Sequence, residues 1–329
     1  MDARWNAFAR AGWIAALVLA LAAPFTLGSY HLYQLTQVLI YAIALVGLNL
    51  LTGYNGQISL GHGAFFAIGG YGTAILAAKL GLPFWAAIPL AGVLCFGAGF
   101  LFGFPALKFG GLYLALATFA LAVAAPQMLS YKGFDAWTGG AMGLQVGKLQ
   151  PPGWSHLSSD QWTYIAALIA ALLLFGFAMN LVGGRVGRAL IAIRDHAIAA
   201  ETMGIDAALY KTTAFGLSAL YAGVAGGLSA LAVGFVSPES FTLPLSLAFL
   251  VGIVVGGLAS IGGAIFGAVF IEYVPNWADQ LSVQFGEGAK ALPGAIYGLL
   301  LIAMMAAAPS GVIGLLRKIV AGLFGAGRA

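Results

Sequence analysis

The stretch Gly183–Lys211, GGRVGRALIAIRDHAIAAETMGIDAALYK, decides the fold by contrast with its surroundings. Charged residues are 14 Lys and Arg plus 10 Asp and Glu, 24 in all, and seven of them lie here: Arg185, Arg188, Arg194, Asp195, Glu201, Asp206 and Lys211. Across the 329 residues, 61% are hydrophobic and only 7% are charged. Such a composition cannot make a soluble surface, so the chain is predicted to be all-α and to cross a membrane repeatedly. The charged stretch is predicted to lie in water, where its Ala- and Gly-rich surface suits close approach by a partner.

Ten apolar runs flank this stretch and define a transmembrane domain over residues 13–307. They are Trp13–Leu27, Tyr33–Leu51, Ala64–Ala78, Phe84–Phe104, Leu112–Leu129, Trp162–Leu181, Thr212–Val233, Leu245–Leu258, Ala264–Val274 and Leu292–Ala307. Several are shorter than the roughly 20 residues that a helix needs to cross the bilayer. We therefore expect about ten segments that span the membrane fully or in part.

The positive charges predict the orientation. With a cytoplasmic N-terminus and ten alternating segments, ten cations fall on the cytoplasmic side: Arg4, Arg10, Lys108, Arg185, Arg188, Arg194, Lys211, Arg317, Lys318 and Arg328. Only Lys79, Lys132, Lys148 and Lys290 fall outside. Cytoplasmic loops normally carry this excess. The N-terminal residues 1–12, the loop 183–211 and the tail 308–329 are thus predicted cytoplasmic, and the polar loop 130–161 external.

Two further patterns concern how the segments pack. Ten segments divide into five and five about the external loop, which would make the second half inverted relative to the first, as in many transporters. Small residues with GxxxG spacing also suit close helix packing in lipid. Such pairs are Gly99/Gly103, Gly223/Gly227, Gly252/Gly256 and Gly263/Gly267.

Several motifs of catalysis and nucleotide binding are missing. The chain has no GxxxxGK[ST], HExxH or GxSxG motif, one cysteine, and four widely separated histidines, so it is predicted to bind no metal and to cradle no ATP. The net charge of +4 is no sign of nucleic acid in a chain of this class. Glu272 is the one acidic candidate for ion coupling, and its place near the end of an apolar run indicates the outer membrane interface. A transporter without its own energy coupling needs an energised partner.

A second informative stretch is Leu51–Tyr71, LTGYNGQISLGHGAFFAIGGY, which is polar but uncharged. One interpretation is a buried break in a helix that lines a water-filled path, because no lipid-exposed loop could leave its backbone groups unpaired. The other is a short cytoplasmic turn between two helices. The candidate path residues are Tyr54, Asn55, Gln57, Ser59, Gly61 and His62.

Within Gly183–Lys211, the segment Gly187–Ile193 is predicted to be a short amphipathic piece. Asp195 is expected to cap a helix over His196–Met203 that Gly204 ends in a left-handed conformation. The small surface of this helix suits a groove on a partner. A connector helix resting on lipid headgroups would carry more Lys and larger apolar residues.

Three ordered motifs resemble a known family: GRALIAIRDHAIAAETMGIDAALYK, LTGYNGQISLGHGAFFAIGGYG and VVGGLASIGGAIFGA. They are similar to the LivM-like permeases of bacterial ABC importers for branched-chain amino acids, a family that also resembles urea and short-chain amide importers. The resemblance covers about Leu35 to Ala307. His196 departs from it, because the family often has an acidic or polar residue there.

The resemblance implies a coupling helix seated on an ATPase subunit. Its residues would be Arg194, Asp195, His196, Ala199, Ala200, Glu201, Met203 and Gly204. It also implies that Gly53–Gly63 helps to line the translocation path. The chain itself would bind no cofactor. Its partners would be a second, LivH-like permease, two ATPase subunits that bind ATP and Mg, and a periplasmic binding protein, all at the bacterial inner membrane.

The sequence thus predicts a permease that passes leucine, isoleucine or valine to the cytoplasm by alternating access. Import of urea or a short-chain amide is the alternative. A stand-alone channel or ion-driven carrier is a second alternative, which the scarcity of intramembrane carboxylates opposes.

Overall fold

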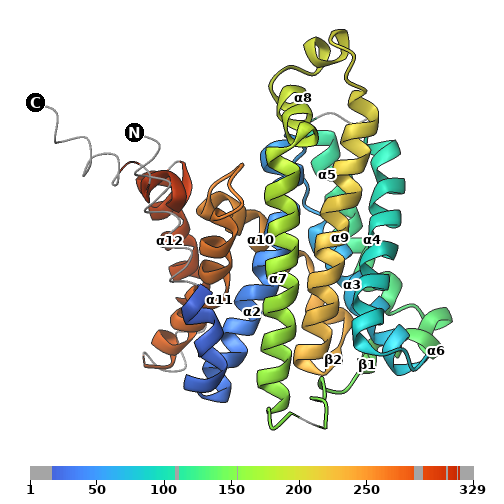
Figure 1. Ribbon diagram of the computed structural model, residues 1–329, viewed down its shortest axis with the longest axis vertical. Helices are drawn as coiled ribbons and strands as arrows, with labels where there is room; N and C mark the ends of the chain where they lie inside the picture. The colour runs from blue at the N-terminus through green and yellow to red at the C-terminus, as the bar shows by residue number, and fades with distance from the viewer. Residues whose placement is uncertain are drawn as a thin grey trace, which may run out of the picture.

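The computed structural model describes residues 17–107, 111–153, 155–284, 292–308, 310–316 and 318. The predicted N-terminal segment 1–12 lies outside the described residues, as does most of the tail 308–329. The described residues form an elongated bundle of helices (Figure 1). The long helices are α2 (Ser29–Asn49), α3 (His62–Ala78), α4 (Phe84–Ala106), α5 (Leu112–Leu129), α7 (Ser159–Gly183), α8 (Arg185–Thr202), α9 (Ala207–Val233), α10 (Leu243–Gly256), α11 (Gly263–Gln284) and α12 (Leu292–Ala307).

Shorter elements complete the described chain. A helix over Leu17–Thr26 precedes α2, and a π-helical turn, η1 (Leu50–Tyr54), continues it. The remaining elements are η2 (Lys132–Phe134), α6 (Asp135–Thr138), η3 (Gly140–Met142), β1 (Leu144–Gln145), β2 (Phe235–Val236) and η4 (Pro238–Phe241). The all-α prediction is confirmed, since the only sheet in the described residues is the antiparallel pair β1–β2.

The apolar runs coincide with helices of unequal length. Among the described residues, six helices are long and apolar enough to cross a membrane, and α5 with the bent segment after it makes a seventh candidate. The helix α3 has 17 residues and is too short by this measure. A multi-pass membrane protein is therefore supported, with fewer full spans than the ten segments that we predicted.

The centre of the bundle is α9, which packs against α2, α3 and α4. Close packing depends on small residues: a Cβ added at Gly69 of α3 would collide with the backbone of Gly223 in α9. The four GxxxG pairs all lie at contacts between helices. Those in α4 and α9 face other helices of the bundle centre, and the pairs Gly252/Gly256 and Gly263/Gly267 pack against each other between α10 and α11. The GxxxG spacing in the sequence thus identified surfaces at which helices pack.

The two ends of the bundle carry the two kinds of loop. The predicted external loop contains α6 and β1, and β1 pairs with β2 so that Leu144 lies opposite Val236. In Figure 1 these elements lie at one end of the bundle and α8 lies at the other. The charged stretch and the predicted external loop are therefore separated by the length of the bundle.

The helix that contains Glu272 is longer than we expected. We expected this carboxylate near the end of its segment, but α11 runs on for 12 residues beyond it, from Gly263 to Gln284 in all. The continuation was missed because Asn276 and Asp279 interrupt the apolar pattern, although the backbone remains helical. Glu272 consequently lies near the middle of α11.

Candidate functional site

The helix α8 has two parts that meet at His196. This residue has extended backbone angles, φ −158° and ψ 92°, so the first part ends there and a short second part follows. In the first part Gly187, Leu190 and Ile193 are buried while Arg185 and Arg188 are exposed, which confirms the predicted amphipathic piece.

The cap of the second part is His196 rather than Asp195. The backbone N–H of Ala199 donates to Nδ1 of His196 at 3.4 Å. Asp195 is instead paired with Arg194, whose Nε and Nη2 both lie 2.9 Å from Oδ1. The predicted cap was wrong because an ion pair with a neighbouring side chain occupies the carboxylate.

The end of the second part agrees with the prediction. Gly204 has φ +84°, the left-handed conformation that favours glycine after a helix. Its N–H donates to the carbonyl of Glu201 at 3.0 Å, and the N–H of Ile205 donates to the carbonyl of Ala200 at 3.1 Å. These two bonds form a Schellman motif, which closes the segment into a compact projection.

The outward face of this projection is mixed apolar and charged. Ile198 and Met203 are 71% and 83% exposed. The remaining predicted coupling residues on this surface are Asp195, His196, Ala199, Glu201 and Gly204, all exposed, whereas Ala200 is buried. Two large apolar side chains held in the open beside acidic groups suit contact with another protein.

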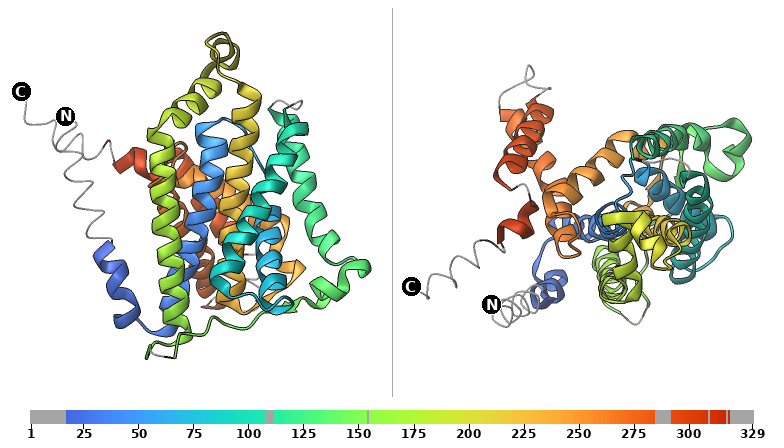
Figure 2. Two further views of the ribbon diagram at one scale, coloured as in Figure 1. Left: turned by 45° about the vertical axis from the view of Figure 1, so that its right-hand side comes forward. Right: turned by 90° about the horizontal axis from the view of Figure 1, so that it is seen from above.

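The second motif begins in the π-helical turn and then enters the bundle. From the α8 end, residues 55–61 descend into the interior, and α3 starts partway down (Figure 2). Of the six candidate path residues, Tyr54, Asn55, Gln57, Ser59, Gly61 and His62, all are buried. The segment is thus largely buried, as the interpretation of a buried break requires, although Gly56 and Ile58 are exposed.

Hydrogen bonds from the surrounding helices hold this segment. Leu60 N–H donates to Thr118 Oγ1 of α5 at 2.9 Å, and Gly63 N–H donates to Ser246 Oγ of α10 at 2.9 Å. Nε2 of His62 lies 3.2 Å from the carbonyl oxygen of Ala44 in α2. His62 thus behaves as a buried polar group with a backbone partner.

Within the segment, Nδ2 of Asn55 donates to Oε1 of Gln57 at 2.8 Å. The amide oxygen of Asn55 itself, Oδ1, is buried and lacks a hydrogen-bond partner in the described structure. A neutral amide pair of this kind can bind a polar solute without the strong attraction of a charge.

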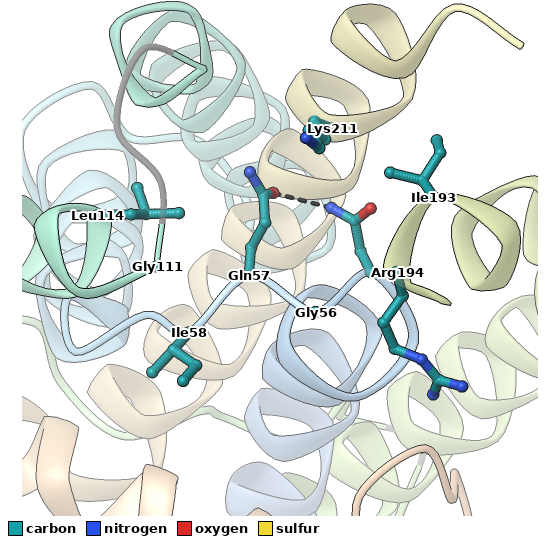
Figure 3. Close-up of a pocket in the computed structure, with 9 residues that line it drawn as sticks. Gly56, Gln57, Ile58, Gly111, Leu114, Ile193, Arg194 and Lys211 are labelled. Atoms are coloured by element: carbon teal, nitrogen blue, oxygen red, sulfur yellow. Dashed lines mark hydrogen bonds between the residues drawn. The ribbon is translucent and has the colours of Figure 1, made fainter. Parts of the chain in front are cut away.

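The two motifs meet at Arg194. Its Nη1 donates to the carbonyl oxygen of Gly53 at 2.9 Å, which joins α8 to the π-helical turn. A Cβ added at Gly56 would lie 2.8 Å from Cγ of Arg194, so the stem of the arginine packs directly on this glycine. In Figure 3 the guanidinium points away from Lys211 while the stem passes beside Gly56.

A cavity of about 160 Å³ lies beside this contact (Figure 3). It is lined by Asn55, Gly56, Gln57, Ile58, Gly111, Leu114, Ile193, Arg194 and Lys211. The amides face one side and Lys211 of α9 the other. The sequence did not indicate Lys211 as part of a site, because it is one of several cations near the end of the charged stretch.

The third motif is attached to the same turn through Asn49. The Nδ2 of Asn49 donates to the carbonyl oxygens of Gly257 at 3.3 Å and Ser260 at 2.9 Å, and its Oδ1 accepts from the N–H of Ala259 at 2.8 Å. Ala259 has φ +55°, an unfavourable conformation for a residue with a Cβ, which these bonds help to fix. All three motifs therefore converge on Asn49–Gly56.

Three polar residues of this arrangement were missed from the sequence: Asn49, Thr118 and Ser246. Each is a lone polar residue in or beside an apolar run, and only its depth in such a run could have marked it. In the described part of the chain, no group of three His, Cys, Asp or Glu side chains is placed to hold a metal ion.

Comparisons with known proteins agree with this architecture. The family described as branched-chain amino acid transport system / permease component matches residues 30–307. The chain is 34% identical over 312 residues to the high-affinity branched-chain amino acid transport system permease protein LivM of Salmonella typhimurium, covering 88% of this chain and 72% of that protein. The LivM protein of Escherichia coli gives the same identity and coverage.

Among solved structures, PsaBC from Streptococcus pneumoniae in complex with Fab aligns with a TM-score of 0.41 and 13% identity, over 88% of this chain and 95% of that one. The family match spans most of the helical bundle and includes all three motifs that meet around Asn49–Gly56. The chain therefore belongs to the family of branched-chain amino acid transport permeases that includes LivM.

Proposed function

We propose that this chain is a membrane-spanning permease subunit of an ATP-binding-cassette importer that moves branched-chain amino acids into the cytoplasm. Membership of the LivM family and the multi-pass helical bundle support this function. The sequence has no motif for binding ATP, so the energy must come from a separate subunit. The motion of that subunit must reach the path mechanically.

The hydrogen bond between Arg194 and Gly53 is the observation that carries the proposal. The second part of α8, which presents Ile198, Glu201 and Met203, would rest on an ATPase subunit. Movement of α8 would pull on the π-helical turn and displace residues 55–61, where the candidate path residues lie. Alternating access then follows from a rigid contact between the docking surface and the path.

In the complete importer this chain would contact three kinds of protein subunit and the membrane lipid. Two ATPase subunits would bind ATP and Mg, a second, LivH-like permease would complete the path, and a periplasmic binding protein would dock at the end that bears α6 and β1. The lipid of the bacterial inner membrane would surround the domain over residues 13–307. We further propose ten full or partial segments in two inverted halves, with residues 1–12 and 308–329 in the cytoplasm.

The test is uptake by the reconstituted importer. The permease pair, ATPases and binding protein are placed in liposomes, and ATP-dependent uptake of leucine is compared with that of urea. Leucine uptake that requires ATP supports the proposal. Uptake of urea but not leucine would assign the chain to an amide importer, and leucine uptake without ATPase subunits would make it a stand-alone carrier.

A charge reversal tests the docking surface separately. Glu201→Lys is expected to reduce copurification of the ATPase by about tenfold or more, because it places a cation in the centre of the contact. Glu239→Lys is the matched control, since this exposed acid lies on η4 at the opposite end of the bundle. If the ATPase copurified equally with the two variants, the assignment of residues 194–204 as the contact with the ATPase would be contradicted.

A further inference from the structure

Glu272 is a carboxylate at the depth of the middle of α2. It lies near the centre of α11, and the residue before it, Ile271, meets Leu45 of α2 at Gly252 of α10. Leu45 is one helical turn from Tyr41, which is at the midpoint of the 26-residue span Ser29–Tyr54. An ionisable group at this depth is costly, and membrane proteins keep one there mainly for function.

The helices around Glu272 supply no counter-ion. Within the described residues, α2, α10, α11 and α12 contain neither lysine nor arginine. The carboxylate receives one side-chain hydrogen bond, from Nδ2 of Asn276 to Oε1 at 3.2 Å. No described group bonds Oε2. Any positive charge that pairs with Glu272 therefore comes from outside these helices.

Further acceptors lie on the helix face that Tyr41 shares. Tyr33, Gln37 and Tyr41 are spaced by four residues, so they follow one face of α2. Nε2 of Gln37 donates to the hydroxyl of Tyr33 at 2.8 Å. Gln37 is only 6% exposed, and its Oε1 is buried without a hydrogen-bond partner in the described residues. This face of α2 and Glu272 on the adjacent α11 form one polar strip.

Part of the strip is open to the outside of the single chain, although Gln37 is buried. Tyr33 is 37% exposed and Glu272 is partly exposed. The helices α2 and α11 pack side by side, at the edge of the bundle that α12 extends (Figure 2). Lipid tails cannot satisfy a carboxylate and an amide, so the strip must face either protein or a water-filled path.

We propose that this strip is a station of the translocation path at which Glu272 binds the ammonium group of the transported amino acid. An ammonium group has three donors, and the acceptors at hand are the carboxylate, Oε1 of Gln37 and the hydroxyl of Tyr41. The zwitterion supplies the positive charge that the surrounding helices lack. This assignment rests on the proposed function, because only an amino acid substrate carries that group.

The first experiment is leucine uptake by the reconstituted importer with Glu272→Gln. This change keeps the size of the side chain and removes the charge. We expect uptake to fall at least about tenfold, while the variant still copurifies with its partners and ATP hydrolysis is still stimulated by the binding protein. Glu272→Asp should keep an intermediate rate. Asp279→Asn, an exposed acid further along α11, should transport normally.

Two results would overturn the assignment. Normal uptake by Glu272→Gln would mean that the carboxyl is neutral and structural, because glutamine mimics the protonated form. Loss of copurification would mean that the strip is a contact between subunits. If the unmodified importer fails to take up leucine, the proposed function fails, and this is seen before any variant is tested.

A second experiment asks whether the ammonium group is what binds. A hydrophobic carbodiimide modifies carboxyl groups within membranes, and mass spectrometry of the unmodified importer measures its reaction at Glu272. Leucine should slow the reaction, whereas 4-methylpentanoate, which has the same side chain without the ammonium group, should not. Equal effects of the two compounds, or no effect of leucine, would contradict the assignment.

Discussion

Arg194 joins two segments that lie 141 residues apart in the sequence. Its guanidinium donates to a backbone carbonyl of the π-helical turn, and its stem fills the space above a glycine of the same turn. The carboxylate of Asp195 accepts from Nε and Nη2 of Arg194 and so fixes the orientation of the guanidinium. A π-helical turn is an irregular element that is often found at functional sites. In the proposed mechanism the arginine would move this turn.

We predict that Arg194→Ala uncouples transport from ATP hydrolysis. The variant should assemble, because Ile198, Glu201 and Met203, which the proposal places on the ATPase, are unchanged, but leucine uptake per ATP hydrolysed should fall by about tenfold or more. Loss of a hydrogen bond with a charged donor is worth about 1.5–3 kcal/mol, which corresponds to a change of this size. The measurement is the ratio of uptake to ATP hydrolysis in proteoliposomes.

Arg188→Ala is the control for this prediction. Arg188 is exposed on the same helix, and its side chain donates only to Gly183 within the adjoining turn, at 3.4 Å. Its ratio should equal that of the unmodified protein. If both variants give the same reduced ratio, the effect belongs to the charge of α8 and not to the contact with Gly53.

The sequence could predict single residues where the cause is local. Gly204 was identified as the helix end because a left-handed residue needs no tertiary partner. The cap was assigned to Asp195 instead of His196 because both side chains can accept from a backbone N–H, and only the ion pair with Arg194 decides between them. Asn49 was missed for a related reason, since its partners at residues 257–260 are more than 200 positions away.

The element that organises the bundle is α9. It carries glycines on several faces: added Cβ atoms at Gly216 and Gly223 would meet α4, and those at Gly226 and Gly227 would meet α3. Gly223 lies against Gly69 of α3, and Gly216 lies beneath Phe96 and Phe100 of α4. In lipid, such close approach supplies the packing energy that burial of apolar surface supplies in water. The positions of α3 and α4 therefore depend on α9.

We predict that Gly69→Ala destabilises the bundle. The added Cβ would overlap the Gly223 backbone, which cannot move aside as a flexible side chain could, so the cost should be about 1–3 kcal/mol. Gly176→Ala in α7 is the control, because nothing lies within 4 Å of its added Cβ and alanine favours a helix by about 1 kcal/mol. Thermal unfolding in detergent should show a lower Tm for the first variant only. A shared decrease would point to a general effect of losing glycine.

Elements were predicted well where hydrophobic composition alone defines them. Every apolar run corresponds to a helix among the described residues, but α11 extends past its run because polar side chains at Glu272, Asn276 and Asp279 do not interrupt a helical backbone. The burial of residues 55–61 could not be decided from composition. Their depth depends on Thr118 and Ser246, which belong to helices elsewhere in the sequence.

At the scale of the whole molecule, the arrangement of loops supports the predicted orientation. The loop 130–161 and the loop after α9 were both predicted external, and strands β1 and β2 pair between them. Backbone bonds from Val146 and Gly147 to the carbonyl of Gly234 extend this contact. Arg185, Arg188, Arg194 and Lys211 lie at the other end, around α8 (Figure 1). These four cations compare with Lys79, Lys132 and Lys148 at the end that bears α6 and β1.

The predicted orientation can be tested by labelling two sites at opposite ends of the bundle. Ala141 lies in η3 and Ala208 at the start of α9, both exposed and at opposite ends of the bundle. Each is changed to cysteine. Cys95, the single natural cysteine, is 0% exposed, so it should react little. A membrane-impermeant maleimide should label Ala141→Cys in right-side-out vesicles and Ala208→Cys in inside-out vesicles. The reversed pattern would place α8 outside the cell, where no ATPase could reach it, and would contradict both the orientation and the coupling through Arg194.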